Sequence, residues 1–155
     1  MATIAADMIS EGKDVINFSV GEPDFNTPKH IINAGKKAMD DGFTKYTSGA
    51  GMIELRQAIC DKLERENGLI YSPSDILVSN GEKQSLYTAC QALFGKGDEV
   101  IVFRPYWVSF PEFVRLSDAE PILVETIPKK NFEPDFSDLK TKIRTNIKGV
   151  IINSP

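Results

Sequence analysis

Four short runs of apolar, mostly β-branched residues constrain the fold of this chain more than any other feature. They are Ile76-Leu77-Val78, Val100-Ile101-Val102-Phe103, Ile122-Leu123-Val124 and Val150-Ile151-Ile152. Runs this short and continuous are typical of strands that are buried on both faces, as in parallel sheets. Helical patterns over 83–94, 108–116 and 136–143 separate them, the last behind the candidate cap Asp135. The alternation predicts an α/β fold, a mostly parallel sheet flanked by helices, with sites at the carboxyl ends of the strands.

The N-terminal part carries a different pattern. Residues 15–20 alternate apolar and polar side chains, which predicts a short, half-exposed strand. Thr27 is then expected to cap a helix over 28–42, which opens with a proline. Apolar residues spaced three and four apart predict a second amphipathic helix that ends near Asn67-Gly68.

Composition and charge exclude several classes of protein. Hydrophobic residues make up 41% of the 155 residues and charged residues 26%, as in soluble globular proteins. The net charge of −4 and the absence of any Lys/Arg run longer than two argue against a nucleic-acid partner. No basic leader precedes an apolar segment, and no apolar stretch approaches the ~20 residues that span a bilayer. We therefore expect a cytoplasmic protein that does not contact membranes.

Cysteine and histidine give no support for a metal site. Cys60 and Cys90 fall inside apolar helical patterns and lack the CxxC spacing of metal and redox motifs, so we interpret both as packing residues. His30 is the single histidine, and its position in the first turn of a helix predicts a surface location.

The junction at residues 79–84, Ser-Asn-Gly-Glu-Lys-Gln, has the chemistry of a phosphate site. It joins an expected strand to an expected helix, where free amides and the positive end of the helix dipole favour an anion. The alternative is an ordinary strand-to-helix turn, which has the same geometry. Neither a Walker A motif nor GxGxxG is present, so the sequence gives little support for a nucleotide site.

Three other stretches are ambiguous when each is taken alone. Residues 21–25, Gly-Glu-Pro-Asp-Phe, are compatible with a simple turn. Lys45-Tyr46 followed by Gly49-Ala50-Gly51 is compatible with a flexible surface loop, and Arg104-Pro105-Tyr106-Trp107 with a packing corner. Their order along the chain is more informative than any one of them.

In that order, these stretches resemble the N-terminal half of the class I aminotransferases, and bacterial aspartate aminotransferases most closely. The matching stretches, which cover nearly the whole chain, are Ile16 to Phe25, Lys45-Tyr46, Glu54-Leu55-Arg56, Asn80-Gly81 with Lys83-Gln84, Gly97-Asp98-Glu99-Val100, Pro105-Tyr106-Trp107 and Asn153-Ser154-Pro155. The resemblance implies the fold type I architecture of enzymes that use pyridoxal 5′-phosphate. It assigns residues 1–27 to the small domain and 28–155 to the first part of the large, cofactor-binding domain.

The resemblance also implies roles for single residues. Gly21 would lie against the substrate carboxylate, and Trp107 would stack on the cofactor ring beside the substrate. Gly81, Glu82 and Lys83 would hold the cofactor phosphate, largely through main-chain amides. Glu82 departs from the Gly or Ala that is usual in the family, which places a carboxylate beside the phosphate and puts cofactor affinity in doubt.

Partners and substrates follow from the same resemblance. Tyr46 would reach the phosphate in the neighbouring subunit, which implies a homodimer. The reaction would move an amino group between an amino acid, aspartate by resemblance, and a 2-oxo acid.

No catalytic residue is assigned to this chain. The family's Schiff-base lysine would lie beyond the last motif, and Lys83 belongs to the phosphate junction, so we expect the 155-residue chain to be inactive alone. The chain also ends directly after an expected buried strand, which indicates a fragment or a missing C-terminal half.

Two alternatives remain open at this point. The chain is compatible with a non-catalytic binding or assembly module of a split protein, which would dock with a separate C-terminal half. It is also compatible with a C–S lyase or decarboxylase of the same fold type.

Overall fold

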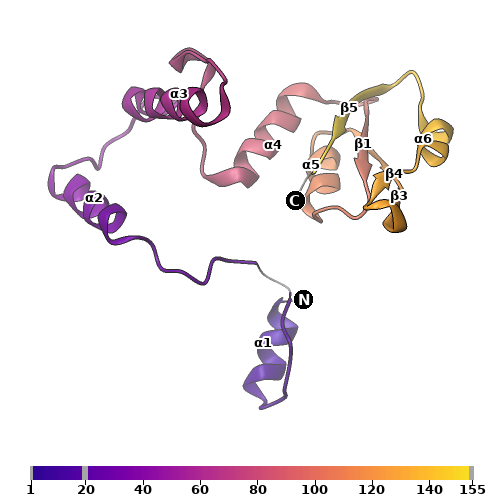
Figure 1. The fold of residues 1–155 in the computed structure, drawn as a ribbon, viewed down its shortest axis with the longest axis horizontal. Helices are drawn as coiled ribbons and strands as arrows, with labels where there is room; N and C mark the ends of the chain where they lie inside the picture. Colours follow the sequence, from indigo (N-terminus) through magenta and orange to yellow (C-terminus); the bar gives the residue numbers. More distant parts are fainter. Residues whose placement is uncertain (1, 19–20, 154–155) are drawn as a thin grey trace. The chain divides into compact units, whose positions relative to one another are not determined.

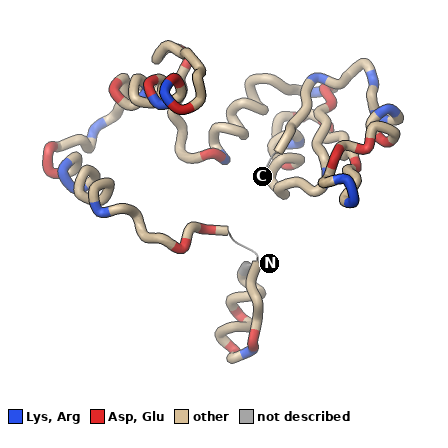
Figure 2. Tube along the Cα trace, viewed as in Figure 1, with Lys and Arg blue, Asp and Glu red and all other residues tan. Residues whose placement is uncertain are grey.

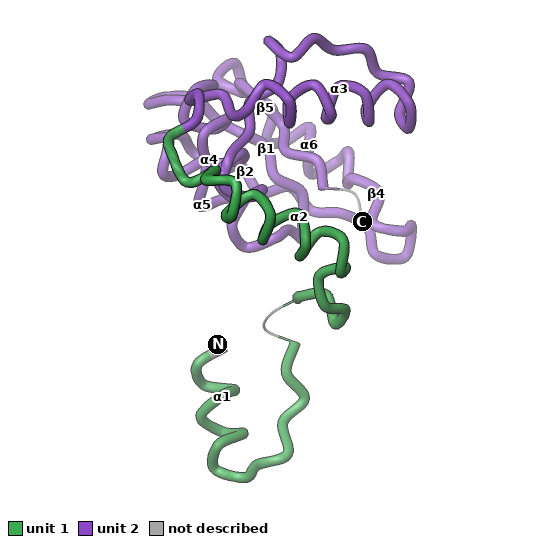
Figure 3. The backbone as a smooth tube through the Cα atoms, turned by 90° about the vertical axis from the view of Figure 1, so that its left-hand side faces the viewer, with its two compact units in different colours: residues 1–46 green, residues 47–155 purple. Residues whose placement is uncertain are grey.

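The computed structural model describes residues 2–18 and 21–153, which belong to two compact units, Met1–Tyr46 and Thr47–Pro155 (Figure 3). The first unit contains α1 (Ala2–Ser10) and α2 (Lys29–Asp40). None of its described side chains is buried, so within the described part of the chain this unit has no core of its own. The boundary expected from the sequence, at residues 27 and 28, stays a prediction.

Two predictions for the first unit are wrong. Residues 15–18 form no strand, and residues 19 and 20 lie outside the described residues. Phe18 is 91% exposed, and no described strand lies beside this segment to complete a ladder. The N-cap of α2 is Pro28 rather than Thr27, and no side chain caps the helix. The helix α1 was not predicted, although its sequence contains three alanines, which favour a helix.

The second unit contains the sheet (Figure 1). Its elements in chain order are α3 (Ile53–Asn67), η1 (Pro73–Asp75), α4 (Gly81–Leu93), β1 (Glu99–Phe103), α5 (Ser109–Leu116), β2 (Glu120–Val124), β3 (Thr126–Ile127), η2 (Pro128–Lys130), β4 (Glu133–Pro134), α6 (Phe136–Lys142) and β5 (Ile147–Ile151). The helices predicted over 83–94, 108–116 and 136–143 are confirmed as α4, α5 and α6. The helix predicted to end near Asn67-Gly68 is confirmed as α3.

Three parallel strands form the sheet, in the order β2-β1-β5. Ile101 in the central strand pairs with Ile122 on one side and with Val150 on the other. The prediction of a parallel sheet flanked by helices is therefore confirmed. A small antiparallel pair, β3 with β4, was not predicted, because two-residue strands leave almost no pattern in a sequence.

The predicted strand at residues 76–78 is wrong. The segment is extended but pairs with no described strand, and Leu77 is 61% exposed. The Val78 N–H instead donates a hydrogen bond to the Ala50 carbonyl in the loop that precedes α3, at 3.0 Å. A buried parallel strand requires a ladder and cover on both faces, which the described residues do not supply here.

The core lies between one face of the sheet and the helices α4 and α5. Val100 and Val102 are almost completely buried and point to this face, where Phe110, Phe113 and Val114 of α5 cover them. In Figure 1, α4 and α5 lie on one side of the strands and α6 lies on the other.

The cysteine and histidine predictions agree with the structure. Cys90 packs in the core cluster with Val102, and Cys60 is buried on α3, so both are packing residues. His30 is exposed on α2, as expected.

The start of α6 is capped as predicted. Asp135 accepts hydrogen bonds from the backbone N–H groups of Ser137 and Asp138 at 2.9 and 3.2 Å, which satisfies two first-turn donors. The Ser137 hydroxyl, followed by these amides, lowers the pKa of Asp135. The amide of Glu125, followed by Lys142, lowers the pKa of Asp138.

These lowered pKa values predict acid sensitivity. A carboxylate whose pKa is lower in the folded state stabilises the fold above its unfolded pKa, about 4 for aspartate, and loses that effect as the pH falls towards the folded value. We expect the urea midpoint to fall between pH 5 and pH 3. The urea midpoint of the Asp135→Asn variant should fall less over this pH range, because the asparagine side chain still caps the helix but does not titrate. An equal fall in both proteins, measured by circular dichroism, would contradict this explanation.

Candidate functional site

The helix predicted to begin in the 79–84 junction is α4, which starts at Gly81, although no strand precedes it within the described residues. The first amides of an α-helix lack intrahelical acceptors. Two of them are satisfied locally: Asn80 N–H donates to Gln84 Oε1 at 2.6 Å, and Gly81 N–H donates to the Ser79 carbonyl at 2.9 Å. Gly81 has φ +80, a conformation that glycine adopts without strain. No atom lies within 4 Å of the position that a Cβ would occupy. The amides of Glu82 and Lys83 follow, where the helix dipole favours an anion.

Trp107 lies next to this junction. The Lys83 Nζ is 5.2 Å from the centroid of the Trp107 ring, within the range of a cation–π interaction. The half-buried indole makes edge-on contacts with two rings of α5. Its ring centroid is 5.5 Å from that of Phe110 and 6.0 Å from that of Phe113. The fold therefore brings together two sequence-predicted features, the helix start and the tryptophan, that are far apart along the chain.

Side chains inside the junction add contacts that the sequence analysis missed. The hydroxyls of Ser79 and Ser85 are hydrogen bonded to each other, and Ser85 lies one turn into α4. Gln84 reaches back to the amide of Asn80, as in a capping box but one residue further along. The Asn-to-Gln spacing was the available signal. These contacts hold the loop against the helix it precedes.

A second contact fixes the helix α4 against α5. Gln91 Nε2 of α4 donates to the Leu116 carbonyl of α5 at 2.6 Å, while Ser117 Oγ donates to the Phe113 carbonyl at 2.9 Å within the end of α5. Sequence patterns alone do not reveal such a contact between helices.

The remaining predicted site residues belong to the first unit. Gly21 is exposed, with no atom within 4 Å of the position of a Cβ, and Tyr46 is fully exposed. The roles assigned to them by resemblance stay predictions.

A pocket of about 570 Å³ opens at the carboxyl ends of β1 and β5, where sites of parallel sheets are expected. Its described lining residues are Val102, Phe103, Arg104, Pro105, Tyr106, Phe110, Thr126, Asn131, Phe132, Pro134, Ile151, Ile152 and Asn153. Arg104 is the one basic side chain in this lining, and Glu125 pairs with it at 2.6 Å. The pocket is thus mainly apolar and presents no unpaired charge among these residues, so the α4 start is the better site for a phosphate.

Positive and negative residues are mixed along the described part of the chain (Figure 2). Figure 2 shows Lys/Arg and Asp/Glu positions interspersed along the helices. Within residues 2–18 and 21–153, no cluster of three or more His, Cys, Asp or Glu side chains is arranged to hold a metal ion. Likewise, none of the helices in the described part of the chain combines the length and apolar character of a bilayer-spanning helix.

Comparison with known proteins identifies the family. The family model described as aminotransferase class I and II matches residues 13–155. The chain belongs to this family. This match confirms the family resemblance that the sequence motifs indicated.

The curated relatives of this chain are named as aspartate or aspartate/prephenate aminotransferases. A probable aspartate/prephenate aminotransferase of Thermus aquaticus is 43% identical over 97% of this chain and 39% of its own length. Aspartate aminotransferase of Geobacillus stearothermophilus is 46% identical over 97% of this chain and 38% of its own length. The chain thus spans about two fifths of the length of these relatives.

Solved aminotransferase structures share the backbone. Aspartate aminotransferase from Thermus thermophilus with maleate is 42% identical, with a TM-score of 0.91 over 99% of this chain and 40% of that one. The enzyme from Thermotoga maritima is 38% identical, with a TM-score of 0.90 over 99% of this chain and 41% of that one. The architecture of the described elements is therefore that of the corresponding part of these enzymes.

Proposed function

We propose that this chain forms one wall of the active site of an aminotransferase that uses pyridoxal 5′-phosphate and moves an amino group between aspartate and a 2-oxo acid. Family membership supports the reaction class. The names of the relatives support aspartate, and the Thermus thermophilus structure with maleate adds a bound four-carbon dicarboxylate in a related protein. A cytoplasmic location stays a prediction from the sequence.

The donor set at the start of α4 fits the cofactor's phosphate. The resemblance names Gly81, Glu82 and Lys83 for this role. The Gly81 N–H donates to the Ser79 carbonyl. The proposed anion donors are therefore the amides of Glu82 and Lys83, and the Lys83 ammonium adds a positive charge. The Glu82 side chain is exposed, so its carboxylate is open to solvent. When bound, pyridoxal phosphate supplies an aldehyde that takes up an amino group and a ring that withdraws electrons from the substrate α-carbon.

The single observation that carries the proposal is the 5.2 Å approach of Lys83 Nζ to the Trp107 ring. It places the Lys83 ammonium over one face of the Trp107 ring at a helix start. A phosphorylated aromatic ring carries the matching anion and π-system. In this arrangement Trp107 orients the ring, while the helix start holds its anionic tail. We assign no proton transfer to Lys83, because it belongs to the phosphate junction.

The chain alone is proposed to bind the cofactor without turnover. Partners follow from the same proposal. A second copy of the full-length protein would bring its Tyr46 to the phosphate, and Gly21 would lie at the substrate carboxylate. If the gene is split, a separate C-terminal half would complete the site.

Fluorescence of Trp107, the one tryptophan of the chain, tests the proposal directly. Titration with pyridoxamine 5′-phosphate, which carries no aldehyde to react with surface lysines, should quench this fluorescence saturably. Lys83→Gln should weaken the apparent affinity about tenfold, the value of one charge-assisted hydrogen bond. Lys96→Gln, which changes a lysine in the loop after α4, is the matched control and should bind as wild type does.

Two outcomes would overturn the proposal. Equal quenching by pyridoxamine without the phosphate would remove the assignment of the α4 start. Turnover of aspartate and 2-oxoglutarate by the isolated chain would contradict its expected inactivity.

A further inference from the structure

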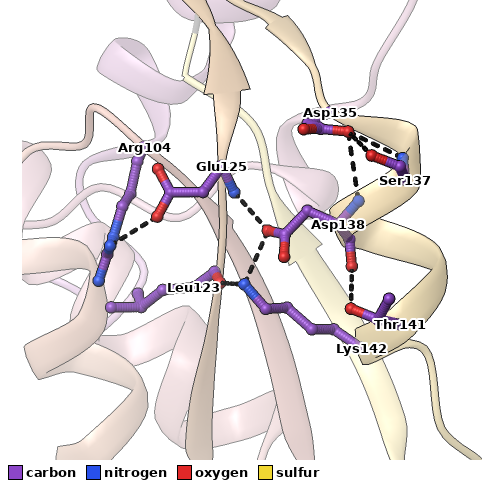
Figure 4. Close-up of polar contacts among 8 residues, drawn as sticks. All are labelled: Arg104, Leu123, Glu125, Asp135, Ser137, Asp138, Thr141 and Lys142. Carbon is purple, nitrogen blue, oxygen red and sulfur yellow. Dashed lines mark hydrogen bonds and ion pairs between the residues drawn. The ribbon is translucent and has the colours of Figure 1, made fainter.

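The end of β2 is held from two sides by polar contacts (Figure 4). One set of contacts leads to Arg104, which follows β1, and the other leads to α6. Arg104 begins the corner Arg104-Pro105-Tyr106-Trp107 that places the indole. The contacts of β2 therefore bear on the position of Trp107.

Arg104 is attached to β2 by its main chain as well as by its side chain. Its N–H donates to the Val124 carbonyl at 2.9 Å, and its carbonyl accepts from the hydroxyl of Thr126. Its guanidinium pairs with Glu125 at 2.6 Å. With these groups held, the corner that follows has little freedom to move without β2. The position of Trp107 thus depends on where the Val124–Thr126 segment lies.

That segment is attached in turn to α6 through Asp138 and Lys142. Asp138 Oδ2 accepts from the Glu125 N–H at 2.8 Å, and Lys142 Nζ donates to the Leu123 carbonyl at 2.7 Å. The two side chains also form an ion pair at 2.7 Å. Figure 4 shows both side chains reaching from α6 to the same strand end.

Burial separates this pair from the other helical ion pairs of the chain. The side chains of Lys142 and Asp138 are 32% and 21% exposed, whereas those of Lys37 and Asp41, at the same i,i+4 spacing, are 74% and 42% exposed. Exposed pairs contribute little, but a partly buried pair that also satisfies backbone groups resists displacement. In the sequence both pairs are simple helix-surface patterns, and only the structure distinguishes them.

We propose that Asp138 and Lys142 are positioning residues that clamp the end of β2, so that the Arg104 corner presents Trp107 beside the start of α4. We call this pair the β2 clamp. The inference rests on the proposed function for the role of Trp107 in cofactor binding. The clamp touches neither substrate nor cofactor and acts through Glu125 and Arg104.

Lys142→Met and Asp138→Ala test the clamp. In both, Trp107 should become more accessible to acrylamide, with a larger quenching constant, because the corner is no longer held. The affinity for pyridoxamine 5′-phosphate should fall up to about tenfold, the value of the stacking contact that a displaced indole loses. Lys37→Met removes an ion pair of the same spacing from α2 and should leave both readouts unchanged.

Rescue distinguishes positioning from general destabilisation. Lys142→Arg keeps donors for the Leu123 carbonyl and the Asp138 carboxylate, so its Trp107 signals should match wild type. Lys142→Gln keeps the polarity but loses the charge, so its signals should follow Lys142→Met. If Lys142→Met fails to fold, the comparison of Arg with Gln decides, and equal Trp107 signals in these two variants overturn the clamp.

The clamp and the proposed function can fail separately. If wild type does not respond to pyridoxamine 5′-phosphate, the proposed function falls, while acrylamide accessibility without ligand still decides the clamp. If the wild type binds but folded Lys142→Met and Asp138→Ala show wild-type accessibility and affinity, the clamp is overturned and the proposed function stands.

Discussion

Phe113→Ala is expected to lower the free energy of unfolding by about 3–5 kcal/mol, the usual cost of removing a buried phenylalanine. Phe113 is 8% exposed and packs in one cluster with Cys90, Val102 and Phe110. Its ring also contacts Trp107 at 6.0 Å. The substitution leaves a cavity between the sheet and α5, and neighbouring side chains can fill it only in part.

Urea unfolding followed by circular dichroism measures this loss. Phe136→Ala on α6 is the matched control, because that phenylalanine is 63% exposed and its loss should change the stability by less than about 1 kcal/mol. Equal effects of the two substitutions would show that the cluster around Phe113 is not the core of the folded chain.

Gly51→Ala is expected to destabilise the chain by about 1–3 kcal/mol through backbone strain alone, with a further loss from steric overlap. Gly51 has φ +96, a conformation that side chains disfavour. A Cβ at this position would lie 2.7 Å from the Cβ of Val78, which cannot rotate away as a flexible side-chain end can. The loop and the 76–78 segment would have to separate, which breaks the hydrogen bond from Val78 to Ala50.

Gly49→Ala, two residues earlier in the same loop, is the control. Gly49 has no atom within 4 Å of a Cβ and no positive φ, so its substitution should leave the thermal midpoint unchanged or raise the stability by up to about 1 kcal/mol. Because Val78 leads into the 79–84 junction, Gly51→Ala should also weaken the quenching of Trp107 by pyridoxamine 5′-phosphate. Equal midpoints for the two alanine variants would contradict the close approach of the loop to Val78.

Local sequence signals predicted the elements that form from local causes. The cap Asp135 and the end of α3 at Gly68 depend on residues within one helical turn, so the pattern was sufficient. The strands β1, β2 and β5 were predicted from continuous apolar residues, but the burial on both faces that this pattern indicates is found in β1, whereas Val150 of β5 is 48% exposed.

The failures have a shared cause. Residues 15–18 and 76–78 carry strand-like patterns, but a strand forms only when another strand completes its ladder. No described strand does so for either segment. The cap expected at Thr27 failed for a smaller reason, since the boundary moved by one residue to Pro28 and removed the side-chain contact.

The sequence by itself determined the family, the parallel α/β class and the helix start at the 79–84 junction, because these follow from residue type, spacing and order along the chain. Tertiary structure alone decided that Lys83 meets Trp107 and that Asp138 and Lys142 reach the end of β2. Such contacts join residues whose separation in sequence leaves no periodic signal. They depend on how helices pack against the sheet, and that packing is settled only when the whole core is assembled.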